Sequence, residues 1–366
     1  MINNNSLNNK IVNNAWFMLK YLYEELGSRK FKSLDISDVQ DINNLYGLVL
    51  GRWCAALARE GLYKEYVTIE GEEMTSPQGQ LDIQETINRQ TKVRGSLVCN
   101  YDELSGDILL NHILKGTMEY LCNSNALVDD TKKEIKKCMQ SFNGIGTVDI
   151  SKVRWNDIKY NNSTIRYKHL LDLSRSVMAE KEIQRSMELT DSMRLYILFK
   201  KQIYKWYLNN YGEEDDVFVI EQPYTLSSET ALDLKTSRNH QLVTIMCDNI
   251  ALLIMVRLQD EKTARDTVIQ REQKQELAKF VSEFKAQYKI KAHGCIIYVN
   301  TNPANLNLQP IVINSFRDIT IGELTVDIND QWLYIENKLK SVYEYFIERV
   351  KVKAKGMGQT SKDKKQ

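Results

Sequence analysis

Residues 241–300 constrain the fold of this chain more than any other stretch. They contain two short apolar runs, 242–247 and 251–258, which are separated by the turn-forming pair Asp248-Asn249. Apolar and β-branched runs joined in this way are typical of two adjacent strands. Apolar residues at helical spacing then predict an amphipathic helix over 271–289, and a further apolar run predicts a strand over 294–300. The order strand, strand, helix, strand predicts an α/β domain.

The same domain is predicted to extend over residues 191–350. A helix is expected to begin at Asp191, because apolar residues recur along one side of it at Leu195, Leu198, Phe199, Ile203 and Trp206. Strands are predicted over 216–220 and 319–327, and a closing helix over 330–350. The second half of the chain is therefore α/β.

The first half is predicted to be a mainly helical domain over residues 1–190, so the chain as a whole is α+β. Amphipathic helices are expected at five places, and a small β element is expected near 66–100, with an exposed loop over 71–79. Asp102 and Ser105 are interpreted as caps of the helix that follows them, since their side-chain oxygens can accept hydrogen bonds from free backbone N–H groups. The five predicted helices cover 10–26, 41–62, 106–121, 130–142 and 165–178.

Composition narrows the class of protein. A chain of 366 residues has room for two domains with separate cores. It has no apolar run of membrane-spanning length and no signal-peptide pattern, and its six scattered cysteines form no CxxC pair, so we expect a cytoplasmic protein with reduced, buried thiols. Net charge is +1, and residues 351–366 contribute six lysines and one aspartate, or +5, which leaves −4 for the rest. We expect this tail to be disordered.

Several short motifs follow one another along the chain: Asn14-Ala-Trp-Phe-Met-Leu19, Cys99-Asn-Tyr-Asp-Glu-Leu-Ser105 and Asn111-His-Ile-Leu-Lys115. In their order and spacing they resemble McrC, the partner subunit of the McrB GTPase in modification-dependent (5-methylcytosine) restriction systems. The resemblance runs from about residue 10 to 350. The family's arginine-glycine turn has Gln78-Gly79 here, and its Leu-Tyr-Glu-x-Phe motif has Ile197 in place of the glutamate.

The resemblance implies a nuclease domain of the PD-(D/E)xK type, but the residues argue against nuclease chemistry. The family's two metal-binding aspartates fall at Leu242 and Met255, its lysine at Arg257, and its helix acid at Ile197. Apolar side chains cannot coordinate Mg²⁺, which prefers oxygen ligands, and an arginine does not accept a proton. The site is therefore predicted to be degenerate, with no catalytic residues, cofactor or metal.

One alternative is a shifted site. Asp233-Leu-Lys235 is itself a D-x-K triplet, with Asp216 and Glu221 upstream at plausible spacing. If this triplet were the site, the chain would be an active Mg²⁺-dependent endonuclease. Against this interpretation, loop-forming residues flank the triplet, and it precedes the strand pair that carries the site in the family.

The favoured function is that of a non-catalytic McrC-like partner of an McrB-like AAA+ GTPase ring in DNA restriction and antiviral defence. Arg52, Arg59 and Arg94 are unassigned candidates for stimulating the motor, and His112 has no second ligand at metal-binding spacing. The chain lacks a P-loop motif, so it is not expected to bind nucleotide in that way. DNA binding is predicted to be weak, a membrane is not an expected partner, and a DNA-binding scaffold is the third hypothesis.

Overall fold

The structure is a computed structural model in which the chain forms two compact units. It describes residues 4–28, 31, 34–124, 127–184, 190–214, 216–224, 240–259, 266–300, 312–316 and 319–348. One unit, called here the sheet unit, comprises Met1–Gly27 and Thr190–Gln366, and the other, the helical unit, comprises Ser28–Leu189. The lysine-rich tail lies outside the described residues.

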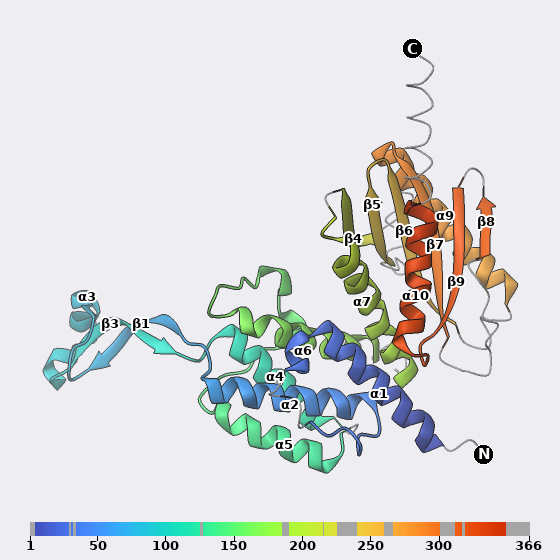
Figure 1. Cartoon of the computed structure of the whole chain (residues 1–366). Helices are drawn as coiled ribbons and strands as arrows, with labels where there is room; N and C mark the ends of the chain where they lie inside the picture. Colours follow the sequence, from blue (N-terminus) through green and yellow to red (C-terminus); the bar gives the residue numbers. More distant parts are fainter. Residues whose placement is uncertain are drawn as a thin grey trace. The chain divides into compact units, whose positions relative to one another are not determined.

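The sheet unit contains a mixed six-stranded sheet with the strand order β4-β5-β6-β7-β9-β8 (Figure 1). Strands β6, β7 and β9 are parallel, whereas β4, β5 and β6 pair antiparallel, as do β8 and β9. The prediction that 242–247, 251–258 and 294–300 share one sheet is confirmed. The strands are β4 (Val217–Tyr224), β5 (His240–Cys247), β6 (Ile250–Gln259), β7 (Lys291–Asn300), β8 (Val312–Phe316) and β9 (Ile319–Asp327).

Helices cover both faces of this sheet. Helix α9 packs its apolar side on a cluster that includes Ala292 of β7. The neighbouring residue His293 lies with its ring centroid 5.8 Å from that of Phe346, which follows α10. Because successive residues of a strand point to opposite faces, α9 and the end of α10 lie on opposite sides of the sheet. The helices of this unit are α1 (Asn4–Leu22), η1 (Glu24–Gly27), α7 (Asp191–Tyr211), α9 (Thr267–Tyr288), α10 (Trp332–Tyr343) and the π-helical η10 (Glu344–Glu348).

Helix α1 belongs to the sheet unit, although residues 1–190 were expected to form one domain. The rings of Phe17 and Tyr21 lie 6.1 and 5.8 Å from that of Trp332 in α10. In addition, Asn14 Nδ2 donates to the carbonyl of Ile328 at 3.2 Å. The amphipathic pattern of α1 correctly predicts a buried face, but such a pattern does not identify the element that covers it. The change of unit near residue 190 lies where the sequence places it.

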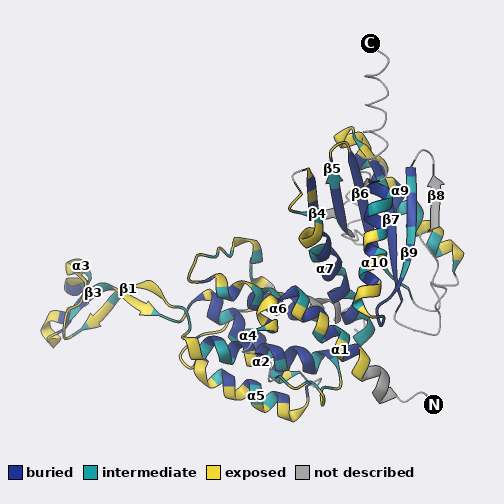
Figure 2. Ribbon diagram, in the orientation of Figure 1, coloured by how far each residue is buried: buried dark blue, intermediate teal, exposed yellow. Residues whose placement is uncertain are grey.

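The helical unit is built around α2, whose N-cap Asp41 accepts a hydrogen bond from Asn44 N. Gly47 and Gly51 allow α5 to approach closely, since a Cβ at Gly51 would lie 3.2 Å from Cγ1 of Ile135. The buried sides of these helices form the core of the unit (Figure 2). Its helices are α2 (Ile42–Glu60), α4 (Leu109–Asn123), α5 (Asp129–Met139), α6 (Lys168–Gln184), η4 (Gln140–Phe142), η5 (Ile150–Lys152), η6 (Trp155–Asp157) and η7 (Ile165–Tyr167).

A narrow arm extends from the helices of this unit (Figure 1). It is a three-stranded sheet of β1 (Glu65–Met74), β3 (Leu97–Ser105) and β2 (Gln80–Leu81), with α3 (Ile83–Asn88) and η3 (Thr91–Arg94) at its tip. The loop predicted over 71–79 begins only after Met74. The sequence Glu70-Gly-Glu-Glu73 lacks the alternation that marks a half-buried strand, because this strand is exposed on both faces.

The capping roles expected for Asp102 and Ser105 are wrong. Asp102 lies within β3, where its Oδ1 accepts from Thr68 Oγ1 of β1 at 2.7 Å. Ser105 Oγ accepts from Asp107 N at 3.0 Å, and Asp107 lies two residues before the first residue of the helix. The N-cap of α4 is Ile108, which offers no side-chain acceptor. The strand extends further toward the helix than the spacing suggested.

All six cysteines are free thiols, and five of them are buried, as predicted, with Cys122 half-buried. Burial raises the pKa of Cys138 to about 11. Among the residues that the structure describes, no helix has the length and apolar character needed to cross a membrane.

Candidate functional site

Leu242 and Met255, the two positions predicted from the family resemblance to correspond to its metal-binding aspartates, lie side by side in the sheet. Val243 pairs with Ile254, so the antiparallel register continued by one residue sets Leu242 opposite Met255. Cross-strand partners share one face of the sheet. Both side chains are in the cluster under α9, with exposed fractions of 0% and 1%. Side chains at these two positions are therefore close enough to act together, but here both are apolar and belong to the core under α9.

Arg257 lies two residues beyond Met255 and hence on the same face of β6. Its Nη2 lies 2.9 Å from Oε2 of Glu276 on α9. A second ion pair joins the same helix to the sheet, with Lys274 Nζ 2.8 Å from Oε1 of Glu323 on β9. Burial raises the pKa of the Tyr298 hydroxyl between them, Glu323 raises it further, and Arg257 opposes the shift. The guanidinium of Arg257 is thus paired with the carboxylate of Glu276 on α9.

The remaining acidic candidates do not join this group. Glu221 pairs with Val243, the neighbour of Leu242, so its side chain is on the opposite face from Leu242 and Met255. There it lies near Lys200 of α7, whose pKa is lowered by burial and raised in part by Glu221. Ile197 lies on the same helix and is half-buried. Asp233 and Lys235 lie outside the described residues.

Metal-ligating side chains do not gather elsewhere in the described ranges. No group of three or more His, Cys, Asp or Glu residues within those ranges is arranged to hold a metal ion. His112 of α4 instead pairs with Asp107, with Nε2 2.5 Å from Oδ1. The same carboxylate oxygen accepts from Gly146 N at 2.6 Å. These contacts tie the start of α4 to the loop after η4 and are structural.

The block Asn111–Lys115, which carries part of the family resemblance, anchors the base of the arm. Asn111 is fully buried, and its Nδ2 donates to the carbonyls of Tyr63 and Gly106 at 3.0 and 2.8 Å. These carbonyls flank the two long strands of the arm. Asn111 Oδ1 accepts from the hydroxyl of Tyr167 at 2.9 Å, and that hydroxyl accepts from Tyr63 N. The buried amide of Asn111 donates to the backbone carbonyls at both ends of the arm, which explains why an asparagine stands at this position.

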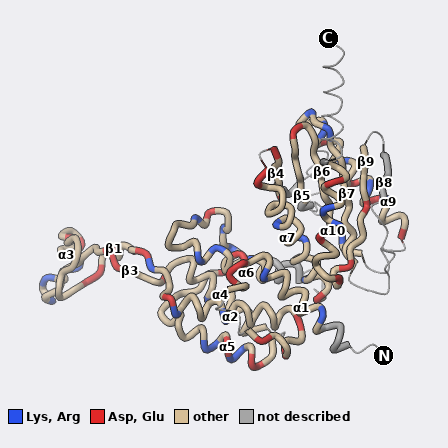
Figure 3. The backbone as a smooth tube through the Cα atoms, viewed as in Figure 1, with Lys and Arg blue, Asp and Glu red and all other residues tan. Residues whose placement is uncertain are grey.

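The arm itself has little core of its own. None of the ten residues of β1 is buried. Residues 65–105 carry eight acidic and three basic side chains, a net charge of −5. Acidic residues follow the strands, whereas the basic residues gather at the tip, in or beside α3 and η3 (Figure 3). An element with this exposure depends on polar contacts for its shape.

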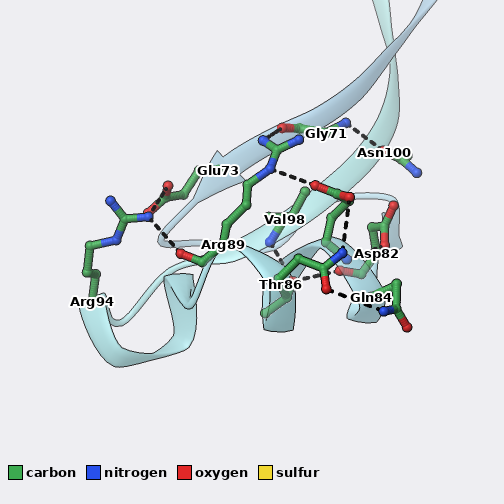
Figure 4. Close-up of polar contacts among 11 residues, drawn as sticks. Gly71, Glu73, Asp82, Gln84, Thr86, Arg89, Arg94, Val98 and Asn100 are labelled. Carbon is green, nitrogen blue, oxygen red and sulfur yellow. Dashed lines mark hydrogen bonds and ion pairs between the residues drawn. The ribbon is translucent and has the colours of Figure 1, made fainter.

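Those polar contacts are concentrated at the tip (Figure 4). Asp82 caps α3 by accepting from Glu85 N at 2.9 Å. Arg89 bridges Glu85 and the carbonyl of Gly71, both at 2.8 Å, and Gly71 N donates to Oδ1 of Asn100 at 2.7 Å. Arg94 lies 3.0 Å from Glu73. The register shift between Ile69 and Glu72 is therefore fixed by side chains from the tip and from β3.

Gly79, in the family's arginine-glycine turn, occupies a position that only glycine fits. Its φ is +67°, and a Cβ there would lie 2.3 Å from the carbonyl oxygen of Asn100. The turn returns the chain to β2, which pairs with β3 through Gln80 and Leu81. Gln78 takes the place of the family's arginine without affecting this backbone requirement.

Apolar side chains project from the tip into solvent. Ile83 and Ile87 of α3 are 68% and 65% exposed, and Val93 of η3 is 87% exposed. Leu81 is 45% exposed beside them. Exposed apolar residues grouped on one element mark interaction surfaces more often than isolated ones do. Sequence reasoning missed this group, although Ile83 and Ile87 at i and i+4 in a short polar segment were a visible signal.

The three arginines singled out from the sequence are separated. Arg94 is at the tip of the arm. Arg52 and Arg59 both line a cavity beside α2, where Arg52 Nη2 lies 2.9 Å from Glu134 Oε1 of α5. Arg59 Nε donates to the carbonyl of Ala55 at 3.2 Å.

The chain thus combines a sheet unit, in which strand, strand, helix and strand follow one another, with a helical unit that carries a projecting arm. The chain belongs to the McrBC family: residues 4–209 match the family described as "McrBC 5-methylcytosine restriction system component". Among curated relatives it is similar to "Type IV methyl-directed restriction enzyme EcoKMcrBC" of Escherichia coli strain K12. The two are 20% identical over 352 residues, which cover 92% of this chain and 98% of the relative.

Two solved structures from Thermococcus gammatolerans are also similar. The first is the "refined half-complex from tetradecameric assembly of Thermococcus gammatolerans McrB AAA+ hexamers with bound McrC". The match is 13% identical, has a TM-score of 0.53, and covers 92% of this chain and 76% of the other chain. The second is a cryo-EM structure of the McrBC complex, 15% identical with a TM-score of 0.40 over 57% of this chain and 61% of the other. The first match shows a common fold over most of the chain.

Proposed function

We propose that this chain is an McrC-like subunit that binds an McrB-like AAA+ GTPase ring and does not itself cut DNA. Two observations support the partner. The chain belongs to the McrBC family, and the similar solved structure is described as McrB AAA+ hexamers with bound McrC. The arm of the helical unit is the element of this chain best suited to the contact.

The observation that carries this proposal is the apolar tip of an otherwise polar arm. Ile83, Ile87 and Val93 stand on two short helices whose positions are fixed by the ion pairs of Arg89 and Arg94. Covering such side chains on binding removes apolar surface from water at about 25 cal/mol per Å². The acidic strands behind the tip favour a partner with basic groups, because complementary charge raises the rate of association and favours the correct partner.

The absence of cleavage is supported by the packing at Leu242 and Met255. A divalent metal in a nuclease site is held by carboxylate oxygens, which replace the water lost from the ion. The described part of β5 and β6 offers apolar side chains at these two positions, and Arg257 is paired with Glu276. The sheet unit would then contact DNA, if it binds any, without acting on the phosphodiester.

Removal of the arm tests the partner. Glu65 and Ser105 are paired residues at the base of the arm, so residues 66–104 can be replaced by a short Gly-Ser linker without stretching the helical unit. We expect this variant to fold and to lose co-purification with an McrB-like AAA+ GTPase. Normal co-purification would overturn the assignment of the arm.

A point variant separates the tip from the rest of the arm. Ile87→Asp places a charge in the apolar group at the tip, and Val268→Asp is the matched control, since Val268 is 62% exposed on α9 of the sheet unit. We expect Ile87→Asp to weaken binding to the motor at least tenfold, and Val268→Asp to leave it unchanged. Equal loss in both variants would point to a non-specific effect of added charge.

A further inference from the structure

A cavity of the helical unit is not used by the proposed function. It has a volume of about 350 Å³ and lies between α2 and α5. Gly51 and Ala55 contribute to its wall on α2. The volume lies at the lower end of the range that small-molecule sites occupy.

The cavity carries an excess of positive charge. Arg52, Arg59 and Lys137 line it together with one carboxylate, Glu134, which gives a net charge of +2. The carboxylate is paired with Arg52. Within the described residues, neither Arg59 nor Lys137 has a carboxylate partner. Both stand in the last turns of their helices, where they offset the partial negative charge of the free carbonyls. Arg59 Nε donates to the carbonyl of Ala55, and both side chains are exposed, so the other N–H groups of Arg59 and those of Lys137 are accessible to an anion.

Glu134 adds a second requirement. Its Oε1 accepts from Arg52, whereas its Oε2 is shielded from solvent and has no hydrogen-bond partner among the described residues. The Glu134 side chain as a whole is 41% exposed, and a ligand that brings an O–H or N–H group into the cavity could donate to this oxygen. The hydroxyl of Ser141 lies on the same wall and can either donate or accept.

We propose that this cavity binds a sugar phosphate of the size of a mononucleotide. The phosphate contacts Arg59 and Lys137, and a sugar hydroxyl donates to Oε2 of Glu134. Inorganic phosphate supplies the first contact alone. A free mononucleotide and the terminal phosphate of an oligonucleotide both supply the two contacts. The site belongs to the helical unit and does not depend on the motor partner.

The test uses the full-length chain and isothermal titration. Three probes are compared: inorganic phosphate, a 5′-mononucleotide, and a short 5′-phosphorylated single strand. We expect the mononucleotide to bind at one site and at least tenfold more tightly than inorganic phosphate, since a hydrogen bond to a charged group is worth roughly a tenfold change or more. Tighter binding of the oligonucleotide than of the mononucleotide would show that the preferred ligand is the terminal phosphate of a nucleic acid and not a free mononucleotide.

Charge removal locates the site. The double variant Arg59→Ala and Lys137→Ala is expected to weaken mononucleotide binding by roughly a hundredfold, for two lost charged contacts. Lys133→Ala is the matched control on α5, because Lys133 pairs with Asp130 and does not line the cavity. Binding that is absent, that survives the double variant, or that falls equally in the control would overturn the proposal.

A second variant distinguishes this site from simple attraction of anions. Glu134→Gln removes a negative charge, so electrostatics alone predicts tighter binding of every anion. The proposed contact predicts that the advantage of the mononucleotide over inorganic phosphate falls by about tenfold, because an amide nitrogen can take the place of the accepting oxygen. An unchanged advantage would overturn the role of Glu134. Circular dichroism of each variant confirms that the helices are intact.

Discussion

Arg257 and Glu276, nineteen residues apart in the chain, form an ion pair of 2.9 Å that joins strand β6 to helix α9. The arginine is the residue predicted to replace the lysine of a PD-(D/E)xK motif, and the glutamate faces it from the covering helix. Both side chains are about three-quarters buried. A carboxylate is therefore present here, but it is paired with a cation, and the two positions predicted to correspond to the metal ligands are Leu242 and Met255.

The first prediction concerns DNA cleavage. Incubation of the purified chain with methylated or unmethylated DNA and Mg²⁺ or Mn²⁺, with and without the motor, should give no cleavage above background. The reason is that apolar side chains at 242 and 255 cannot replace the water stripped from the ion. The measurement is a gel assay of nicking and linearisation.

If DNA cleavage were observed, variants of the alternative triplet Asp233-Leu-Lys235 would identify its source. Cleavage that disappears in Asp233→Ala or Lys235→Ala would show a working shifted site and contradict the proposed function. Cleavage that persists in both variants would come from a contaminant or from another subunit.

The ion pair should contribute to the stability of the sheet unit. Glu276→Gln leaves the Arg257 guanidinium without this carboxylate partner, which should lower the free energy of unfolding by about 1–3 kcal/mol. The matched control is Glu344→Gln, which affects the exposed pair Lys340–Glu344 and should cost about 0.5 kcal/mol or less. Urea denaturation followed by tryptophan fluorescence measures both. Equal effects would mean that the Arg257–Glu276 pair is as weak as a surface pair.

Gly79→Ala should disturb the arm without unfolding the helices. An added Cβ would meet the carbonyl oxygen of Asn100 at 2.3 Å and would also have to adopt a positive φ. We expect faster proteolysis within 65–105 and weaker motor binding, with little change in the melting of the helical unit. Gly27→Ala is the control, because nothing lies within 4 Å of its added Cβ. Unchanged proteolysis in Gly79→Ala would contradict the conclusion that only glycine fits at this turn.

The contacts of Asp107 should make the stability of the helical unit depend on pH on the acidic side. The hydrogen bond from Gly146 N, followed by that from His112, lowers the pKa of Asp107 below its usual value of 3.8. A carboxyl group with a lowered folded pKa stabilises the fold above its unfolded pKa and loses that contribution as pH falls through the folded pKa. Thermal melting of the wild type and Asp107→Asn should therefore differ at pH 6 and converge below pH 3.8. A constant difference would exclude titration of Asp107 as the cause.

Sequence reasoning was most accurate where burial is greatest. Strands β5, β6 and β7 are covered on both faces and therefore appear as continuous apolar runs. The two-residue turn at Asp248 and Asn249 was also predictable, because Asp248 adopts a positive φ of 50° that aspartate tolerates. Helix α9 was predicted from its single apolar stripe. Each of these signals is local in the chain.

Contacts between distant segments were not predictable. Nothing in the pattern of α1 indicates that it packs beside α10, and nothing near Arg257 indicates a partner on α9. Strand β1 was missed beyond Ile69 because a strand exposed on both faces has no alternation of apolar and polar residues. At the candidate site, the assignment of the family's aspartates to Leu242 and Met255 stays a prediction, and the pairing of these two residues under α9 required the structure.

The edge of the arm has a consequence for how copies of this protein behave. Strand β1 pairs with β3 on one side only, so on its other side alternate residues direct their backbone N–H and C=O groups away from the described sheet. Such an edge is a template for sheet growth between molecules. Glu65, Glu70, Glu72 and Glu73 lie along it, and two such edges placed together would bring carboxylates against carboxylates. Mutual repulsion near neutral pH thus keeps the arms of separate molecules apart, and acidification would remove that protection against fibrous association.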